Sequence, residues 1–366
     1  MKLSTDLTLD LDYTTEQTLL HDSVHRCFAD LSSRPSVAGT SFAACRRAIA
    51  ELGLTGLLVP ESLGGDGMGL IEAQIACSAA AAACLPFPLL ELLLSCRWAA
   101  ELQPAAAANI MRGGELSTVA VQGHGRLTAG RVAGQAIVPY AAQCRWLALP
   151  VHEDGRMLMA LADLRHPGCS IELAHQFDLS YELNKVSFDI PASDLTLGAS
   201  SLPVEALGVL AAAELVGASE SCLKLATQYA KDRTQFGNPI GSYQAIKHSL
   251  ANDFMMLDNA RVASQYLGAA FDNAVACGWA LESEACQEAM TALHVAKSYC
   301  GDAARCIAED SLQIHGAIAM SWELDVHRML RRVIRLSAYA GQPQEHRAIL
   351  SRSLLSGKSL GIAGLA

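Results

Sequence analysis

The sequence lacks the features that mark several common classes of protein. It has 12 cysteines in 366 residues, but no two of them form a C-x-x-C pair. Cys77 and Cys84 lie among alanines and leucines, which is typical of buried, reduced thiols, so we expect neither a disulfide framework nor a cysteine-rich metal centre. His21 and His25 have the spacing of one helix face, but no third ligand is near them in sequence. We therefore expect no metal site.

Charged residues are also scarce, at 17% of the chain, whereas 51% are hydrophobic, which predicts a large core. The formal net charge is −10, and because nucleic-acid-binding proteins are more often basic, we expect no nucleic-acid partner. The N-terminal residues 1–17 are acidic and do not resemble a signal peptide. The apolar region 73–96 is interrupted by Pro86, Pro88 and Glu91, which predicts two buried helices and no membrane span. The chain is thus predicted to be cytoplasmic.

No nucleotide-binding motif of the α/β type is present. The glycine-rich run 60–70 lacks the Lys-Ser/Thr pair of a phosphate-binding loop, so it predicts a turn. Helical patterns and strand-like runs do not alternate, and there is no fixed repeat, which excludes a doubly wound nucleotide fold. The pattern predicts a multidomain α+β protein: an N-terminal helical domain (1–113), a small central β-barrel or sandwich domain (114–200) and a C-terminal four-helix bundle (201–366).

One motif in the C-terminal part contains the residue types expected in a dinucleotide-binding site. Arg233 offers a permanently charged guanidinium whose donors match phosphate oxygens. Phe236 is one helical turn later and is expected on the same face, and Gln244 is expected just inside the next helix. The alternative is structural, with the arginine closing a helix and the phenylalanine in the core. The residues alone leave both interpretations open.

A second motif, residues 313–328, has similar properties. Gln313 supplies an amide that donates and accepts, and Gly316 after a predicted helix allows close approach to the backbone. The structural alternative is a helix end with a glycine cap.

Taken together, three segments resemble the acyl-CoA dehydrogenases, FAD-dependent enzymes with helical, β and helical domains. The resemblance covers nearly the whole chain. It rests on the segments ELGLTGLLVPESLGGDGMGL, DRTQFGNPIGSYQAIKH and QIHGAIAMSWELDVHR, in that order. The combination in this layout is highly specific.

The resemblance implies a cofactor site that crosses a subunit boundary. In the family, the Arg-x-x-Phe segment holds the pyrophosphate and adenine side of the neighbouring subunit's FAD. These roles would fall on Arg233, Phe236 and Gln244, and the Gln-Ile-x-Gly segment would bring Gln313 and Gly316 to the same FAD. A homodimer or a pair with a related chain is implied, commonly as a tetramer.

The reaction implied is α,β-dehydrogenation of an acyl-CoA thioester, with electron-transfer flavoprotein as the usual acceptor. A carboxylate removes the α-proton in a dry site while the β-hydride leaves to the flavin. In many members this base is the Glu of a Tyr-Glu-Gly run. Here Tyr339 and Gly341 are present, but Ala340 occupies the position of the base.

A second family location for the base falls on Leu207, which also has no carboxylate. Glu205 is two residues away, about 200° around a helix, and is expected to be solvated near the helix start. Glu214 is no better placed. The Glu-Pro…Gly-Ser-Asp segment of the family's β domain is missing between 113 and 151, and Ala317 replaces a second glycine.

Four hypotheses follow from these departures. The first is a dehydrogenase subunit whose base comes from a related chain, as in heteromeric bacterial enzymes of steroid breakdown. The second is a self-sufficient homo-oligomer with a relocated base such as Glu205, and the third is a scaffold with no turnover. The fourth is a flavin oxidase or monooxygenase on this fold. The first is favoured, because a scaffold has little need of Arg233, Phe236 and Gln244.

Overall fold

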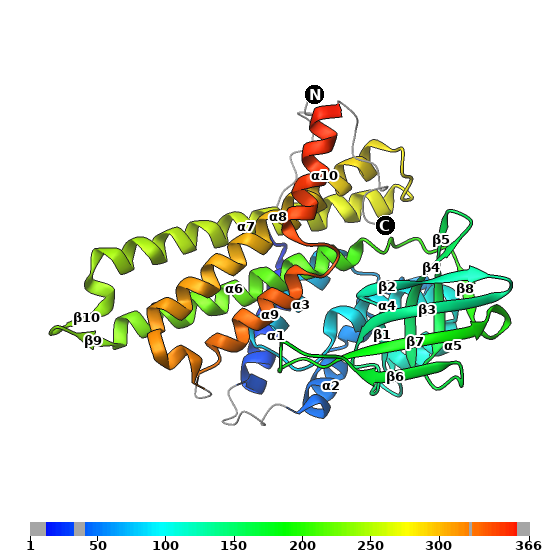
Figure 1. Cartoon of the computed structure of the whole chain (residues 1–366), viewed down its shortest axis with the longest axis horizontal. Helices are drawn as coiled ribbons and strands as arrows, with labels where there is room; N and C mark the ends of the chain where they lie inside the picture. Colours follow the sequence, from blue (N-terminus) through cyan, green and yellow to red (C-terminus); the bar gives the residue numbers. More distant parts are fainter. Residues whose placement is uncertain (1–11, 33–40, 322–323, 357–366) are drawn as a thin grey trace.

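The predicted order of a helical, a β and a helical part is confirmed. The computed structural model describes residues 12–32, 41–321 and 324–356. Residues 1–11, most of the N-terminal segment read for a targeting signal, lie outside the described residues, as do Trp322 and Glu323 of the second motif. Figure 1 shows a long helical bundle with the sheet beside one of its ends. The domain boundaries after residues 113 and 200 stay predictions.

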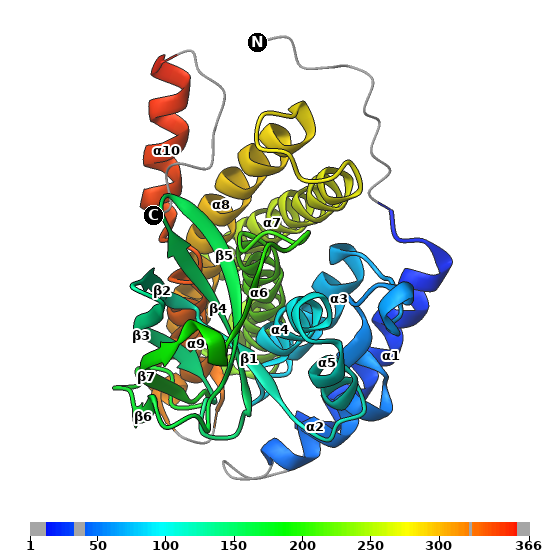
Figure 2. The same ribbon diagram turned by 90° about the vertical axis from the view of Figure 1, so that its right-hand side faces the viewer.

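The N-terminal part is helical, and Figure 2 shows it lying beside the sheet. Every residue of α4 from Leu89 to Ala100 is buried, as expected for a predominantly apolar helix. The start of α3 is capped from far along the chain, because the Asp272 carboxylate accepts a hydrogen bond of 2.7 Å from the Leu70 N–H. The elements are α1 (Thr15–Ser32), α2 (Phe42–Glu51), η1 (Leu54–Gly56), η2 (Glu61–Leu63), α3 (Leu70–Ala82), α4 (Leu89–Leu102) and α5 (Pro104–Met111).

The β part is one connected sheet of eight strands, in the order β6-β7-β3-β2-β4-β5-β8, with β1 paired to β4. Most neighbours are antiparallel, whereas β4 runs parallel to both β1 and β2. Four strand-like runs in the sequence became β1, β4, β5 and β7. The strands are β1 (Ser117–Val119), β2 (Gln122–Thr128), β3 (Arg131–Pro139), β4 (Trp146–Glu153), β5 (Arg156–Asp163), β6 (Cys169–Leu173), β7 (Leu183–Pro191) and β8 (Thr196–Gly198), with η3 (Ala192–Asp194) before β8.

The C-terminal part contains the longest helices. The first four match the predicted helices to within a few residues, and α10 packs on α8 and rises away from the bundle in Figure 1. The elements are α6 (Ala206–Asp232), β9 (Thr234–Gln235), β10 (Asn238–Pro239), η4 (Ile240–Ser242), α7 (Gln244–Ala276), α8 (Glu284–His315), η5 (Gly316–Met320), α9 (Val326–Ser337) and α10 (Pro343–Ser356).

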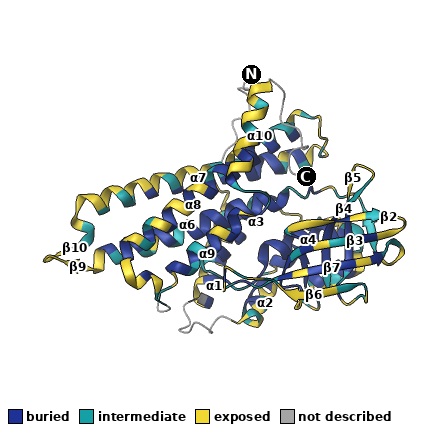
Figure 3. Ribbon diagram, in the orientation of Figure 1, coloured by how far each residue is buried: buried dark blue, intermediate teal, exposed yellow. Residues whose placement is uncertain are grey.

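The hydrophobic core is continuous through all three parts. One cluster of buried side chains joins the N-terminal helices, the sheet and α6 to α9. Figure 3 shows the buried residues in α3, α4 and α6, while the outer face of α7 and the β9–β10 hairpin are exposed. In the described part of the chain, α6 alone is long and apolar enough to cross a membrane, but 89% of its most apolar window is buried in the fold.

Candidate functional site

The first motif forms a β-hairpin at the far end of the bundle. α6 ends before Arg233, which has extended backbone geometry (φ −76°, ψ 119°), and β9 and β10 pair antiparallel after it. The turn residues Phe236 and Gly237 both have positive φ, +51° and +82°. This is the geometry of a two-residue type I′ turn. The prediction that Arg233 and Phe236 share a helical face is therefore wrong, and Gly237 was the local signal for the turn.

Phe236 is not a core residue. Its ring is 93% exposed at the tip of the hairpin. A bulky side chain in left-handed backbone geometry is a true outlier and costs roughly 1–2 kcal/mol. Because no burial compensates for this strain, the structural alternative for Phe236 is excluded, and strained, exposed residues of this kind are typical of binding sites.

Arg233 and Gln244 lie on the two sides of this hairpin. The Ile240 N–H donates to the Arg233 carbonyl at 2.8 Å, which fixes the backbone across the base of the hairpin. Gln244 begins α7, as predicted, and is exposed. Within the described ranges, neither side chain has a hydrogen bond or an ion pair to another residue, so both are available to a ligand or a second chain.

Gln313 and Gly316 lie at the same end, where α8 finishes (Figure 1). Gln313 is exposed, and Gly316 has φ +67° and ψ −145°, which only glycine adopts without strain. The ring of Tyr229 in α6 stacks on that of His315 with centroids 4.5 Å apart, and a small apolar cluster joins α6, α7 and α8 here. The structure thus brings all five predicted positions to one end of the bundle and exposes them.

The two family locations for the base are adjacent in space. Ala340 has φ +53°, and a methyl group built on Gly208 would lie 3.3 Å from the Ala340 Cβ. Leu207 precedes Gly208 in the first turn of α6. Neither Leu207 nor Ala340 carries a carboxylate, so neither can serve as the base that the resemblance implies at these two positions.

The two nearby glutamates are elsewhere. Glu205 occupies the N-cap position of α6 without a capping hydrogen bond from its side chain, and it is half-buried, so the expectation that it is solvated is wrong. Burial raises the pKa of Glu205, and its carboxylate contributes to raising the pKa of Cys286 in α8. Glu214 lies deeper in α6 and is buried. Burial, followed by repulsion from Glu91, raises the pKa of Glu214 to about 7.

Beneath Tyr339, buried charges join the three parts of the chain. The Arg335 guanidinium donates to the Tyr339 hydroxyl at 2.7 Å and lies 3.1 Å from Asp178, in the segment before β7. The Tyr181 hydroxyl donates to Glu91 of α4 at 2.7 Å. Burial would raise the pKa of Asp178, but Arg332 and Arg335 outweigh it and hold that pKa below its usual value. Sequence reasoning missed this cluster, because its members are far apart in the chain.

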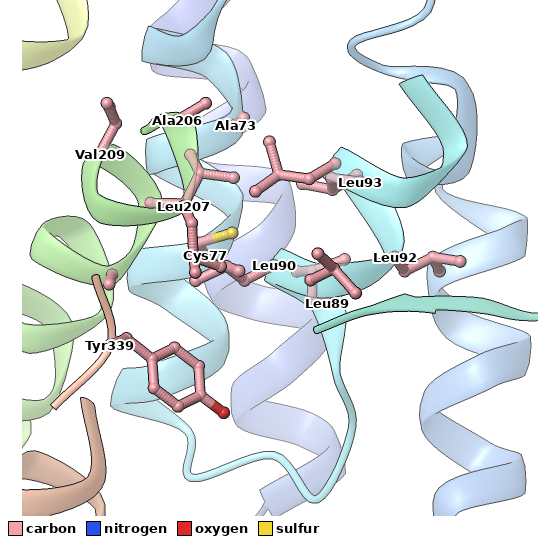
Figure 4. Close-up of a cluster of buried hydrophobic side chains, with 14 of the residues drawn as sticks. Ala73, Cys77, Leu89, Leu90, Leu92, Leu93, Ala206, Leu207, Val209 and Tyr339 are labelled. Atoms are coloured by element: carbon pink, nitrogen blue, oxygen red, sulfur yellow. The ribbon is translucent and has the colours of Figure 1, made fainter. Parts of the chain in front are cut away.

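Buried apolar side chains from α3, α4 and α6 form a cluster that includes Tyr339, as Figure 4 shows. The other labelled members are Ala73, Cys77, Leu89, Leu90, Leu92, Leu93, Ala206, Leu207 and Val209. Tyr339 thus belongs to the core, whereas the next residue, Ala340, is only partly buried.

Buried histidine and lysine side chains pack near the Tyr339-Ala340-Gly341 segment. The ring of His346 in α10 contacts the backbone of Ala340 and Gly341, and its Nδ1 lies 2.8 Å from Nδ1 of His294. The Lys297 Nζ donates to the carbonyl of Leu336 at 3.2 Å, at the end of α9. Burial lowers the pKa of Lys297 to about 7 and that of His294 to about 4, so this support is essentially uncharged above neutral pH.

His21 and His25 do share a face of α1, with ring centroids 4.2 Å apart. Among the residues that the structure describes, no group of three histidines, cysteines or acids is placed to hold a metal ion.

The helical, β and helical order, with both motifs at one end of the bundle, is the layout that the resemblance to the acyl-CoA dehydrogenases implies. Sequence models of the acyl-CoA dehydrogenase N-terminal and C-terminal domains match residues 14–100 and 200–355, which together make up more than half of the chain. The chain belongs to the acyl-CoA dehydrogenase family, whose cofactor is FAD.

Named relatives extend this result. The chain is 27% identical over 297 residues to acyl-CoA dehydrogenase IpdE2 of Mycolicibacterium smegmatis, covering 81% of this chain and 82% of the relative. It is 30% identical over 305 residues to acyl-CoA dehydrogenase FadE34 of Mycobacterium tuberculosis, covering 80% of this chain but 39% of the relative.

Among solved structures, a chain of the ChsE4-ChsE5 complex from Mycobacterium tuberculosis has a TM-score of 0.78 at 20% identity, covering 95% of this chain and 99% of that one. A chain of the Tcur3481-Tcur3483 steroid ACAD has a TM-score of 0.79 at 20% identity, covering 93% and 98%. At these identities the likeness establishes the fold.

Proposed function

We propose that this chain is one subunit of a heteromeric acyl-CoA dehydrogenase and that a related chain supplies the base. In this assembly, Arg233, Phe236, Gln244, Gln313 and Gly316 hold the ADP half of an FAD whose flavin ring lies in the partner's site. The observation that carries the proposal is that both base locations, at Leu207 and Ala340, lack a carboxylate. The Arg233 and Gln244 side chains, by contrast, are exposed and have no hydrogen bond or ion pair within the described part of the chain.

The residues at that end fit the ADP half of FAD. The Arg233 guanidinium binds the pyrophosphate with charge-assisted hydrogen bonds, and the exposed Phe236 ring offers a flat apolar surface to adenine. Gln244 and Gln313 supply amides that donate and accept, and Gly316 lets the cofactor approach the backbone. The chemistry that FAD supplies is acceptance of the substrate's β-hydride.

The packing around Tyr339 supports the same division of work. A proton can be removed from the α-carbon only if the thioester reaches a carboxylate, and here the residue after Tyr339 is Ala340, which packs against the core and carries none. The chain therefore binds and orients a cofactor, and turnover takes place in the site that the partner completes.

The relatives support the substrate class and the partner. ChsE4-ChsE5 and Tcur3481-Tcur3483 are named as pairs of chains, and the latter is a steroid ACAD. We accordingly assign this chain to lipid or steroid catabolism in the cytoplasm, with an acyl-CoA substrate. The natural electron acceptor in this proposal is electron-transfer flavoprotein.

A second candidate is a self-sufficient homo-oligomer that uses Glu205 as its base. The half-buried Glu205, whose pKa is raised by burial, is the observation in its favour. Glu205→Gln distinguishes the two, because it removes activity with flavin retained only if Glu205 is the base.

The test compares the chain alone with the chain co-expressed with a related dehydrogenase chain that retains the base. Flavin absorbance and reduction of an artificial acceptor by a short-chain and a steroid-derived acyl-CoA are measured for both. We expect little flavin and no turnover from the chain alone, and both from the complex. Turnover by the chain alone would refute the proposal, and a complex with neither flavin nor activity would favour a scaffold.

Arg233→Ala tests the cofactor assignment within that complex. Hydrogen bonds to a charged group contribute about 1.5–3 kcal/mol, so FAD affinity should fall by about 10-fold to 150-fold. Arg305→Ala is the matched control, because Arg305 is an exposed arginine of α8 that pairs with Glu309 at 2.8 Å. Unchanged flavin content in Arg233→Ala would show that the assignment is wrong.

A further inference from the structure

A cavity of about 210 Å³ lies between α1, α3, α6 and α7 and has no part in the proposed function. On α6 it is lined by Ala213, Val216 and Glu220. Leu207 and Glu214, seven residues apart and thus on one face of α6, instead belong to the surroundings of Tyr339 and Glu91. The cavity, here named the α1 cavity, is therefore separate from the location of the missing base.

The floor and one wall of the α1 cavity are apolar or aromatic. Ile75, Ala213 and Val216 form a buried apolar floor. Along α1 the rings follow one another, with the centroid of His21 6.2 Å from that of Tyr13 and 4.2 Å from that of His25. Such a wall suits the face of another ring.

The opposite wall, on α6 and α7, presents hydrogen-bonding groups. Arg261 and Glu220 pair at 3.1 Å, which places donors and an acceptor side by side at the cavity. Gln265 adds an amide that, among the described residues, has no hydrogen-bond partner. Alternating donors and acceptors of this kind match the edge of a heteroaromatic ring or a carboxamide.

The charges of the lining disfavour an anion. Arg261 is already neutralised by Glu220. Burial and then the neighbouring His21 lower the pKa of His25, so its imidazole is uncharged at neutral pH. With no unpaired cation in the lining, a carboxylate or phosphate would lose its hydration without compensation.

We propose that the α1 cavity binds a neutral, single-ring heteroaromatic molecule that carries an amide or amine. An apolar cavity of about 150 Å³ accommodates benzene, so about 210 Å³ corresponds to roughly eight heavy atoms. Nicotinamide and the pyrimidine bases have this size. Their rings would lie on the apolar floor against the α1 rings, with their polar edges at Glu220, Arg261 and Gln265.

Calorimetric titration of the purified complex with nicotinamide, cytosine and nicotinate tests this proposal. Nicotinamide and nicotinate differ by amide against carboxylate, so they separate a neutral site from an anion site. We expect saturable binding of nicotinamide or cytosine, and binding of nicotinate at least tenfold weaker. No saturable binding of any of the three, or tighter binding of nicotinate, would overturn the proposal.

Two variants locate the binding. Val216→Phe fills the cavity and should abolish the heat signal. Glu220→Gln replaces one of the two acceptor oxygens with an NH2 donor and should weaken binding about tenfold. Glu309→Gln, which removes an acid paired with Arg305 outside the cavity, is the matched control and should bind normally. If Val216→Phe does not fold, the half-exposed Glu220 decides the result: unchanged affinity in Glu220→Gln places the ligand elsewhere and refutes the proposal.

Discussion

Replacing Lys297 with methionine should stabilise the protein, although Lys297 forms a hydrogen bond in the fold. Its side chain is 0% exposed, and burial lowers its pKa from 10.5 to about 7. At pH 7 this amine is fully protonated in the unfolded chain but only about half protonated in the folded chain. The difference of about 3.5 pKa units corresponds to about 5 kcal/mol of lost stability below pH 7 and to about 4 kcal/mol at pH 7.

Methionine has a similar length and no charge, so Lys297→Met removes this penalty. The loss of the bond from Nζ to the Leu336 carbonyl leaves a buried acceptor unpaired, which costs about 1–3 kcal/mol. The net gain at pH 7 is therefore about 1–3 kcal/mol. Because the folded pKa is the lower one, wild-type stability should rise with pH between about 7 and 10.5, and the variant should lack that rise.

Urea unfolding at pH 7.0 and pH 9.5 measures both effects. Lys185→Met, at an exposed position of β7, is the control and should change neither the stability nor its pH dependence. If Lys297→Met destabilises the protein at both pH values, or keeps the wild-type slope, then Lys297 is charged in the fold and the reasoning fails.

Three further predictions concern other buried or strained positions. Burial and the neighbouring Asp310 raise the pKa of Asp253, which is 1% exposed, from 3.8 to about 7, so this carboxyl lowers stability as pH rises above 3.8. Asp253→Asn should thus add up to about 4 kcal/mol at pH 8 and almost nothing at pH 4 in urea unfolding, with exposed Asp258→Asn as control. Arg335→Met should cost about 3–5 kcal/mol, because it removes the nearer of the two buried arginines that neutralise Asp178 and leaves Arg332 at 3.8 Å. A thermal midpoint like that of Arg347→Met, at a surface pair, would contradict this. Gly316→Ala should add about 1–3 kcal/mol of backbone strain and lower the flavin content of the complex; a flavin content equal to wild type would show that this turn tolerates a side chain.

The parts of the fold that follow local patterns could be predicted from the sequence. The long apolar helices and the strands β1, β4, β5 and β7 have clear periodicity or β-branched and aromatic runs. β2 was missed, because Gly123, His124, Gly125 and Arg126 give it no apolar alternation and its partners β3 and β4 stabilise it. The hairpin at Phe236 was missed because the predicted helix was extended past the true end of α6.

The candidate site likewise has features that the sequence predicts and features that it does not. The positions of Arg233, Gln244, Gln313 and Gly316 followed from motifs, and their exposure at one end required the packing of α6, α7 and α8. The Asp178–Arg335 pair joins residues 157 positions apart, and the α1 cavity needs four helices to form. No local sequence pattern predicts either feature, because the contacts that stabilise a buried charge or enclose a cavity join residues far apart in the chain.

The loss of the base and the packing around Tyr339 are physically related. A glutamate at position 340 would need a dry setting with an open space for the thioester, close to Glu91 and Glu214, which already share the Tyr339 surroundings. Each added buried carboxylate raises the pKa of the others and costs stability. With alanine at 340 the chain can instead pack leucines against Tyr339. The motif end bears no such constraint, because its groups are exposed and, in the assembly that we propose, become desolvated only when a cofactor and a second chain cover them. In that proposal, division of the reaction between two related chains removes the costly half of the site from this one and leaves the half that a surface can provide.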